Sequence, residues 1–198
     1  MAFKIKSTLL LIAFLGSMYG QKPFKEELFW SIWHPIAAFK VKKLYSKAYE
    51  IYNHPNTKIE LDNYNNGGKL DAFRHVYFMS VLSQKIKVKK LRKLGIAHEK
   101  GNYRQFKNHQ NEEGERPDSL GNVMDLINNE LGFKIGSENK KNSLGELKEI
   151  VITEIKNGKS VIIKRNKHGM YVECDNKIID MQLYKGKWFV PKCLVPSN

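Results

Sequence analysis

Apolar residues in this chain follow a helical period over most of its length and a strand-like pattern near the C-terminus. Between residues 24 and 131 they recur every three or four positions, which is the period of amphipathic helices. After Gly136 one further helix is expected, because Ser143 and Glu146 have capping-box spacing, and short runs rich in β-branched residues follow it. The sequence therefore predicts an α+β fold that is mainly α.

We expect this fold to have two parts. Residues 21–136 form a helical domain of about five helices, and residues 143–198 form a smaller part with one helix and an antiparallel β-meander. The expected helices cover about residues 24–33, 36–52, 70–85, 88–100, 120–131 and 144–156. The expected strands lie at about residues 160–165, 170–174, 177–183 and 187–190. The stretches 53–68 and 101–119 have the composition of loops, and Gly132 is expected to end the fifth helix.

Residues 1–20 have the pattern of a secretory signal peptide. Lys4 and Lys6 give it a basic start, and the apolar stretch at residues 9–16 is too short to span a bilayer. The best cleavage point follows Gly20. We expect a secreted or periplasmic protein with no transmembrane segment once this peptide is removed. An uncleaved N-terminal anchor is the alternative.

The chain has two cysteines, Cys174 and Cys193. An oxidising compartment would let them form one disulfide that closes a short loop, and the alternative is a pair of buried thiols. Without a neighbouring pair of histidines, two cysteines are too few for a structural zinc site. The cysteines therefore bear on the expected export rather than on a metal.

The charge of the chain is strongly positive. Lys and Arg number 34 against 20 Asp and Glu, which gives a formal net charge of +14. Such an excess favours binding to an anionic polymer or lipid surface, and it equally suits a soluble protein with a lysine-rich surface. Nucleic acid is not expected as a partner, because the lysines are scattered evenly and the chain carries an export signal.

The segment 71–79 places charged residues among bulky apolar ones. Asp71 and His75 are four residues apart and Arg74 is three from Asp71, so on a helix all three share one side. The same helix must also bury several large apolar residues, which makes a wholly solvated position for the charges difficult. This segment is the first candidate for a polar site.

Three further groups of polar residues stand in apolar surroundings. They are His98 with Glu99 on the fourth expected helix, Asp125 with Asn128 and Asn129 on the fifth, and His34 at the first helix junction. Buried charges need partners, and the interior of a helical bundle commonly holds such sites. We therefore expect the polar faces of three helices to converge on one pocket.

The first interpretation of this pocket is a hydrolytic site. His75 would act as a general base oriented by Asp71, and Arg74 would stabilise a developing anion. The other candidates for catalysis are His98, Glu99 and Asp125. The candidates for binding a cofactor, whose identity the sequence does not give, are Asn128, Asn129 and His34.

The second interpretation is a divalent metal site. Its ligands would come from the same acidic and histidine residues, Asp71, His75, His98, Glu99 and Asp125. No pair of them has the His-Glu-x-x-His spacing of a zinc protease helix, which weakens this interpretation. The third interpretation is structural: a satisfied polar network fixes how three helices dock, in a secreted binding or structural module.

The ordered combination of these motifs resembles an uncharacterised bacterial family, a domain of unknown function. The family pattern has an Asp-Ala-x-Arg-His helix, a His-Glu step and a Met-Asp-x-x-Asn-Asn-x-x-Gly helix. These parts correspond to residues 71–75, 98–99 and 124–132. With the Trp-His-Pro step at residues 33–35, the resemblance covers about residues 33–132. It implies no particular reaction.

Overall fold

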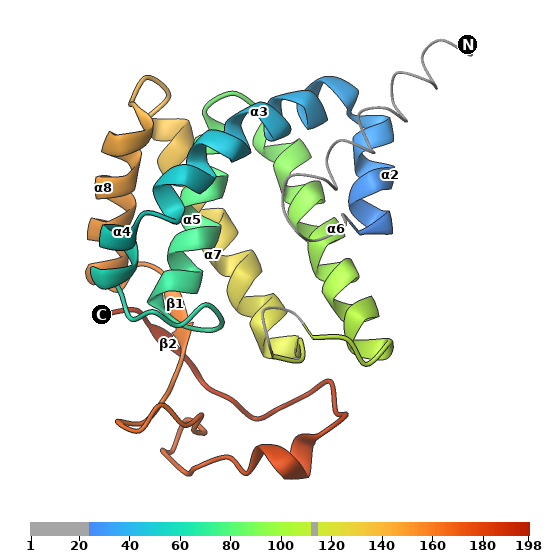
Figure 1. Cartoon of the computed structure of the whole chain (residues 1–198), viewed down its shortest axis with the longest axis vertical. Coiled ribbons are helices and arrows are strands. Elements are labelled where there is room, and N and C mark those ends of the chain that lie inside the picture. Colours follow the sequence, from blue (N-terminus) through green and yellow to red (C-terminus); the bar gives the residue numbers. More distant parts are fainter. Residues whose placement is uncertain (1–23, 112–114) are drawn as a thin grey trace.

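The computed structural model describes residues 24–111 and 115–198, so the expected signal peptide, residues 1–20, lies outside the described residues. Within them the chain forms seven α-helices, one short 3-10 helix and two strands (Figure 1). The α-helices are α2 (Lys25–Trp33), α3 (Pro35–Tyr52), α4 (Pro55–Ile59), α5 (Lys69–Ser83), α6 (Val88–Lys107), α7 (Ser119–Glu138) and α8 (Leu144–Lys156). The 3-10 helix is η1 (Met181–Tyr184), and the strands are β1 (Val161–Ile163) and β2 (Leu194–Pro196). The predicted class, α+β and mainly α, is confirmed.

Helices α5 and α7 form the centre of the helical part and lie side by side (Figure 1). Two glycines of α7 allow their close approach. A Cβ on Gly132 would lie 2.5 Å from the carbonyl oxygen of Val76, and a Cβ on Gly136 would overlap the carbonyl oxygen of Ser80. The prediction that Gly132 ends this helix is wrong, because the glycine serves helix packing and α7 continues to Glu138.

Two segments expected as loops are partly helical. The short helix α4 lies inside the stretch 53–68, where Pro55 occupies the first helical position and the His54 side chain accepts a hydrogen bond from the Asn56 amide. Helix α6 extends to Lys107, beyond the expected end near residue 100. Phe106 explains the extension, because it is buried near the end of α6 and its ring lies 5.0 Å from that of Trp188.

Helix α8 packs on the helices that precede it in the sequence. Its apolar face is buried in the same core as α3 and α5, and this face consists of Leu147, Val151, Ile152 and Ile155. The residues that α5 contributes to this core are Leu70, Phe73, Val76, Tyr77, Phe78 and Val81. The structure therefore groups α8 with the helical part rather than with the strands.

The C-terminal segment contains less regular structure than the sequence predicts. Strands β1 and β2 pair antiparallel, with Val161 opposite Pro196 and Ile163 opposite Leu194. The runs expected as strands at 170–174 and 177–183 form only isolated bridges, and a regular meander is therefore not observed in the described residues. Runs this short, separated by tight turns, leave few consecutive residues for a ladder.

A disulfide closes a loop inside this segment, and apolar packing attaches the segment to the rest of the chain. Cys174 and Cys193 form a disulfide, as one of the two alternatives expected from the sequence. Met124 of α7 packs in a small apolar cluster with the C-terminal residues Ile163, Tyr171, Ile179 and Val190. Within the described residues, none of the helices is both long and apolar enough to cross a membrane.

Candidate functional site

Helix α5 places Asp71 and His75 one turn apart, and both side chains are buried. Asp71 lies in the first turn of α5, where the amides at a helix N-terminus favour a carboxylate. Its Oδ2 accepts a hydrogen bond from the backbone amide of Gly67 at 2.7 Å. Gly67 has a φ of +72°, a conformation that suits glycine and turns its amide into this position. Asp71 is thus held as a carboxylate at the start of α5.

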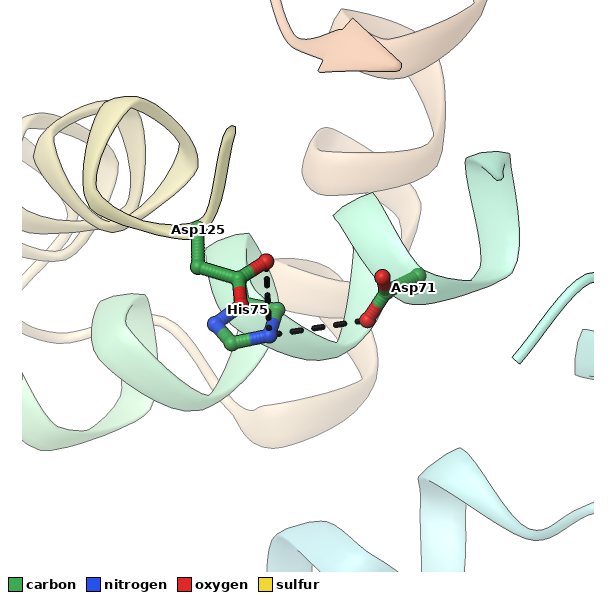
Figure 2. A group of neighbouring side chains, drawn as sticks. All are labelled: Asp71, His75 and Asp125. Carbon is green, nitrogen blue, oxygen red and sulfur yellow. Dashed lines mark ion pairs between the residues drawn. The ribbon is translucent and has the colours of Figure 1, made fainter. Parts of the chain in front are cut away.

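Asp125 of α7 approaches His75 from the helix that packs against α5. Its Oδ1 lies 3.2 Å from Nε2 of His75, and Oδ1 of Asp71 lies 3.5 Å from the same nitrogen. Figure 2 shows the two dashed lines, one to each carboxylate, meeting at a single ring nitrogen of His75. An unprotonated Nε2 would direct its lone pair at two carboxylates. We therefore assign the proton of the neutral ring to Nε2, which leaves Nδ1 as the basic nitrogen.

Arg74 completes this cluster. Its Nη2 donates to Oδ1 of Asp71 at 2.6 Å and lies 3.3 Å from Nε2 of His75. The guanidinium has further N–H groups besides the one that Asp71 accepts. A buried carboxylate is costly without a partner, and the arginine supplies that partner. We call Asp71, Arg74, His75 and Asp125 the polar cluster.

The pKa values of the α5 residues follow from these contacts. Burial lowers the pKa of His75, and the positive charge of Arg74 adds to this effect against the opposing influence of Asp71. Burial by itself would raise the pKa of Asp71, but Arg74, His75 and the Gly67 amide together hold it below its usual value. Near neutral pH the site therefore contains an ionised Asp71 beside a neutral imidazole.

A cavity of about 630 Å³ adjoins one side of the polar cluster. His75 and Arg74 line it, together with His98 of α6 and Asn129 of α7. The aromatic residues in its wall come from α2 and the residue before it, from α3 and from α5, and they are Phe24, Trp30, Tyr45, Tyr49, Tyr52 and Phe78. Cavities of this size with an apolar wall and a few polar groups are typical of sites that bind small molecules.

A second, much smaller pocket adjoins the other side of the cluster. It has a volume of about 20 Å³, which is close to the space that one water molecule needs. Asp71, Arg74 and Asp125 line it, and Lys192 of the C-terminal segment forms part of its wall. Lys192 is itself paired with Asp118 at 2.6 Å. Arg74 therefore borders both the large cavity and the small polar pocket.

The structure places the α6 candidates differently from each other. Nδ1 of His98 lies 2.9 Å from Oε1 of Glu27, and His98 lines the large cavity. Glu99 is buried, and its Oε2 accepts a hydrogen bond from Nδ2 of Asn102 at 3.2 Å. The Glu99 carbonyl also accepts from Nδ2 of Asn122 at 3.0 Å, so this part of α6 is fixed to α7.

The remaining candidates have separate locations. The Asn128 amide bonds the backbone of Val161 twice, from its Nδ2 to the carbonyl and from the Val161 amide to its Oδ1, each at 2.9 Å. This pair of bonds joins α7 to β1. Asn129 faces the large cavity and lies next to Gly95 of α6. His34 lies between α2 and α3, with its ring 5.3 Å from that of Trp30.

Sequence reasoning missed two groups of residues at this site. Glu27 holds His98, although the two lie far apart in the sequence, and nothing in the α2 sequence marks it. The three tyrosines Tyr45, Tyr49 and Tyr52 were expected only as an apolar helix face. The sequence signal for a cavity wall was the use of tyrosine where an ordinary apolar helix face would carry leucine or valine. Tyrosine hydroxyls suit a wall that is half apolar and half polar.

The polar cluster and all residues that line its cavity except Phe24 and Glu27 lie within the region that the family model matches. The chain belongs to the family described as domain of unknown function (DUF6973), which matches residues 28–159. The expected family class is thereby confirmed, over a region that reaches beyond residue 132. No curated protein and no solved structure matches the chain.

Proposed function

We propose that this protein is a hydrolase in which His75 is the general base. The observation that carries the proposal is the position of the His75 ring, with Nε2 held by Asp125 and Asp71 and with the ring lining a cavity large enough for a substrate. Asp125 is the nearer carboxylate and is the positioning residue for His75. Asp71 holds the guanidinium of Arg74.

The proposed reaction uses one water molecule. Nδ1 of His75 takes a proton from the water, and the water oxygen attacks a carbonyl carbon of the substrate. Arg74 stabilises the oxyanion that forms. The imidazolium then gives its proton to the leaving oxygen or nitrogen, the bond from carbon to that atom breaks, and His75 returns to its neutral form.

The cavity wall supports an ester or amide substrate with a large apolar group. Tyr45, Tyr49 and Phe78 form a continuous aromatic surface, because the Tyr45 ring stacks on both of the others at 5.9 and 4.3 Å. Such a surface favours an aromatic or extended aliphatic group of the substrate. Lys42 and Lys58 also line the cavity, which favours a substrate with a negative charge away from the scissile bond.

The test is hydrolysis of p-nitrophenyl esters and p-nitroanilides with short and long acyl chains. We expect His75→Gln to lower kcat by about 100-fold or more, since it removes the base, and Asp125→Asn to lower it less. His168→Gln is the matched control, because His168 is exposed on the C-terminal segment. Hydrolysis that His75→Gln leaves unchanged would contradict the proposal, and it would favour a binding or structural module whose polar cluster only docks helices.

A divalent metal centre is the second candidate. One ligand atom from each of Asp71, His75 and Asp125 lies within 4.8 Å of the others, and all three residues are buried. The guanidinium of Arg74, however, already supplies a positive charge 2.6 Å from Asp71 and 3.3 Å from His75. This contact favours the metal-free hydrolase. A stoichiometric metal in the purified protein that Asp125→Asn removes would reverse this preference.

Export and an anionic partner complete the proposal. The pattern of residues 1–20 supports export, and so does the disulfide, which is typical of proteins from oxidising compartments. The net charge of +14 supports an anionic polymer or lipid surface as the partner. Fractionation of cells that express the full chain, followed by mass spectrometry of its N-terminus, tests export and cleavage after Gly20.

A further inference from the structure

Helices α2 and α3 meet at a corner (Figure 1). Large apolar side chains on both helices are exposed around this corner. Five of them lie within eleven consecutive residues, and we call them the corner patch: Phe29, Ile32, Trp33, Ile36 and Phe39. Trp33 is 79% exposed and Ile36 is 75% exposed. Single exposed apolar residues are common, but a group of this size on one part of a surface marks a site of interaction.

The spacing of these residues shows that they belong to two helix faces. Phe29, Ile32 and Trp33 are three and four residues apart on α2, and Ile36 and Phe39 are three apart on α3. The opposite faces of the same helices line the large cavity. They carry Trp30 and Ser31 on α2 and Ala38 and Val41 on α3. The corner patch is therefore the outer side of one wall of that cavity.

Several lysines lie near the corner patch. The start of α6 lies against the corner, because Nε1 of Trp30 donates to the carbonyl of Lys90 at 2.8 Å and Nζ of Lys40 donates to the carbonyl of Lys85 at 3.3 Å. Burial and then the ammonium groups of Lys90 and Lys93 lower the pKa of His34, which places both charges near this histidine. The corner thus combines exposed apolar groups with several positive charges.

Acidic residues are scarce in the segments that form the corner, and Glu130 of α7 is already paired with Arg92 of α6. The sequence has no Asp or Glu between residues 28 and 49 or between residues 72 and 98. The two acids of α2, Glu26 and Glu27, form ion pairs with Arg104 and His98 of α6. The positive charge at the corner is therefore available to an anionic surface.

We propose that the corner patch inserts into the surface of an anionic lipid bilayer. Tryptophan and large aliphatic side chains enter the interface between lipid headgroups and acyl chains, and the nearby lysines are attracted to anionic headgroups. A protein partner with an apolar surface would satisfy the patch but would not account for the lysines near it. This inference concerns the outside of the molecule and stands independently of the proposed reaction.

Binding to vesicles tests the inference. The probe is co-sedimentation of the full chain, and of the chain that begins at Gln21, with vesicles of equal parts phosphatidylglycerol and phosphatidylcholine at low salt. We expect the double substitution Trp33→Ala with Ile36→Ala to weaken binding by about tenfold or more, because two side chains lose their burial in the membrane. Pure phosphatidylcholine vesicles should bind the unchanged protein much more weakly.

The matched control is Leu183→Ala with Phe189→Ala. These residues are 66% and 64% exposed on the C-terminal segment, far along the chain from the corner, and we expect their loss to leave vesicle binding unchanged. Equal binding by the corner variant and the unchanged protein would overturn the inference, as would equal losses in the two double variants. A corner variant that changes only the sedimentation coefficient of the protein would also overturn it, and it would assign the patch to a second copy of the chain.

Discussion

The α5–α7 pair and the C-terminal segment, which begins with β1, are stabilised in different ways. The helix pair depends on close backbone approach, since Gly132 and Gly136 of α7 lie against the α5 backbone, and on buried charges that satisfy each other. The segment has little regular structure and depends on the Cys174–Cys193 disulfide, on one small apolar cluster and on the side chain of Asn128. The comparison indicates that the closely packed helices α5 and α7 fix the geometry of the polar cluster. The C-terminal segment only contributes to the wall of the small pocket beside it.

The largest effect is expected from Gly136→Ala, because the new Cβ would overlap the carbonyl oxygen of Ser80 and force α5 and α7 apart. We expect a loss of about 3 kcal/mol or more in the free energy of unfolding, measured by urea denaturation. Gly145→Ala is the control, since a Cβ there meets nothing within 4 Å, and it should be neutral or stabilising. Similar results for the two substitutions would contradict the close-approach argument.

Replacing both cysteines by serine should destabilise the protein by about 3 kcal/mol, because it frees a loop of the C-terminal segment in the unfolded chain. The comparison predicts where the effect appears. Amide hydrogen exchange should rise in residues 164–193 and stay unchanged in α5 and α7. Faster exchange throughout α5 would show that the segment supports the helix pair more than the structure indicates.

Asn128→Ala should cost about 2 kcal/mol, since it removes two hydrogen bonds and leaves the backbone groups of Val161 without partners. Denaturation with urea gives the total cost, and hydrogen exchange at β1 locates it. Asn122→Ala serves as a comparison, because its bond to the Glu99 carbonyl joins two helices rather than a helix and a strand. Unchanged exchange at β1 in Asn128→Ala would contradict the role of this side chain as a connection.

The smallest effect is expected from pH. The pKa of His75 is lowered in the folded protein, so on acidification below about 6.5 the unfolded chain takes up a proton before the folded one does. The free energy of unfolding should therefore decrease as the pH falls through this range. Urea denaturation at about pH 7.5 and about pH 5.5 measures the decrease, and His75→Gln should reduce it. A pH dependence that His75→Gln leaves unaltered would assign the titration to other groups.

The sequence predicted the helical part well because apolar period and capping residues are local signals. It also predicted that Asp71 and His75 share a helix side and that Asp125 lies near them, since each is embedded in residues that must be buried. The prediction for Gly132 failed because a glycine that ends a helix and a glycine that admits a neighbouring backbone look the same in one sequence. The predictions of the short strands failed because the pairing of strands depends on residues that are distant in the sequence.

The side-chain partners at the site could not be predicted from the sequence for the same reason. A helical period assigns Asn128 and His98 to helix faces, but it does not reveal that Asn128 bonds Val161 or that His98 pairs with Glu27. These contacts depend on how α2 and β1 dock against the central helices. Local spacing could therefore predict the elements of the site, whereas only tertiary structure shows which of its groups face the cavity.

The boundary of the family match separates the polar cluster from one wall of the small pocket. All four residues of the polar cluster lie within residues 28–159, whereas Lys192, in the wall of the small pocket, lies outside them. A substitution of Lys192 would therefore alter the wall of the small pocket and remove the partner of Asp118 without replacing any residue of the polar cluster.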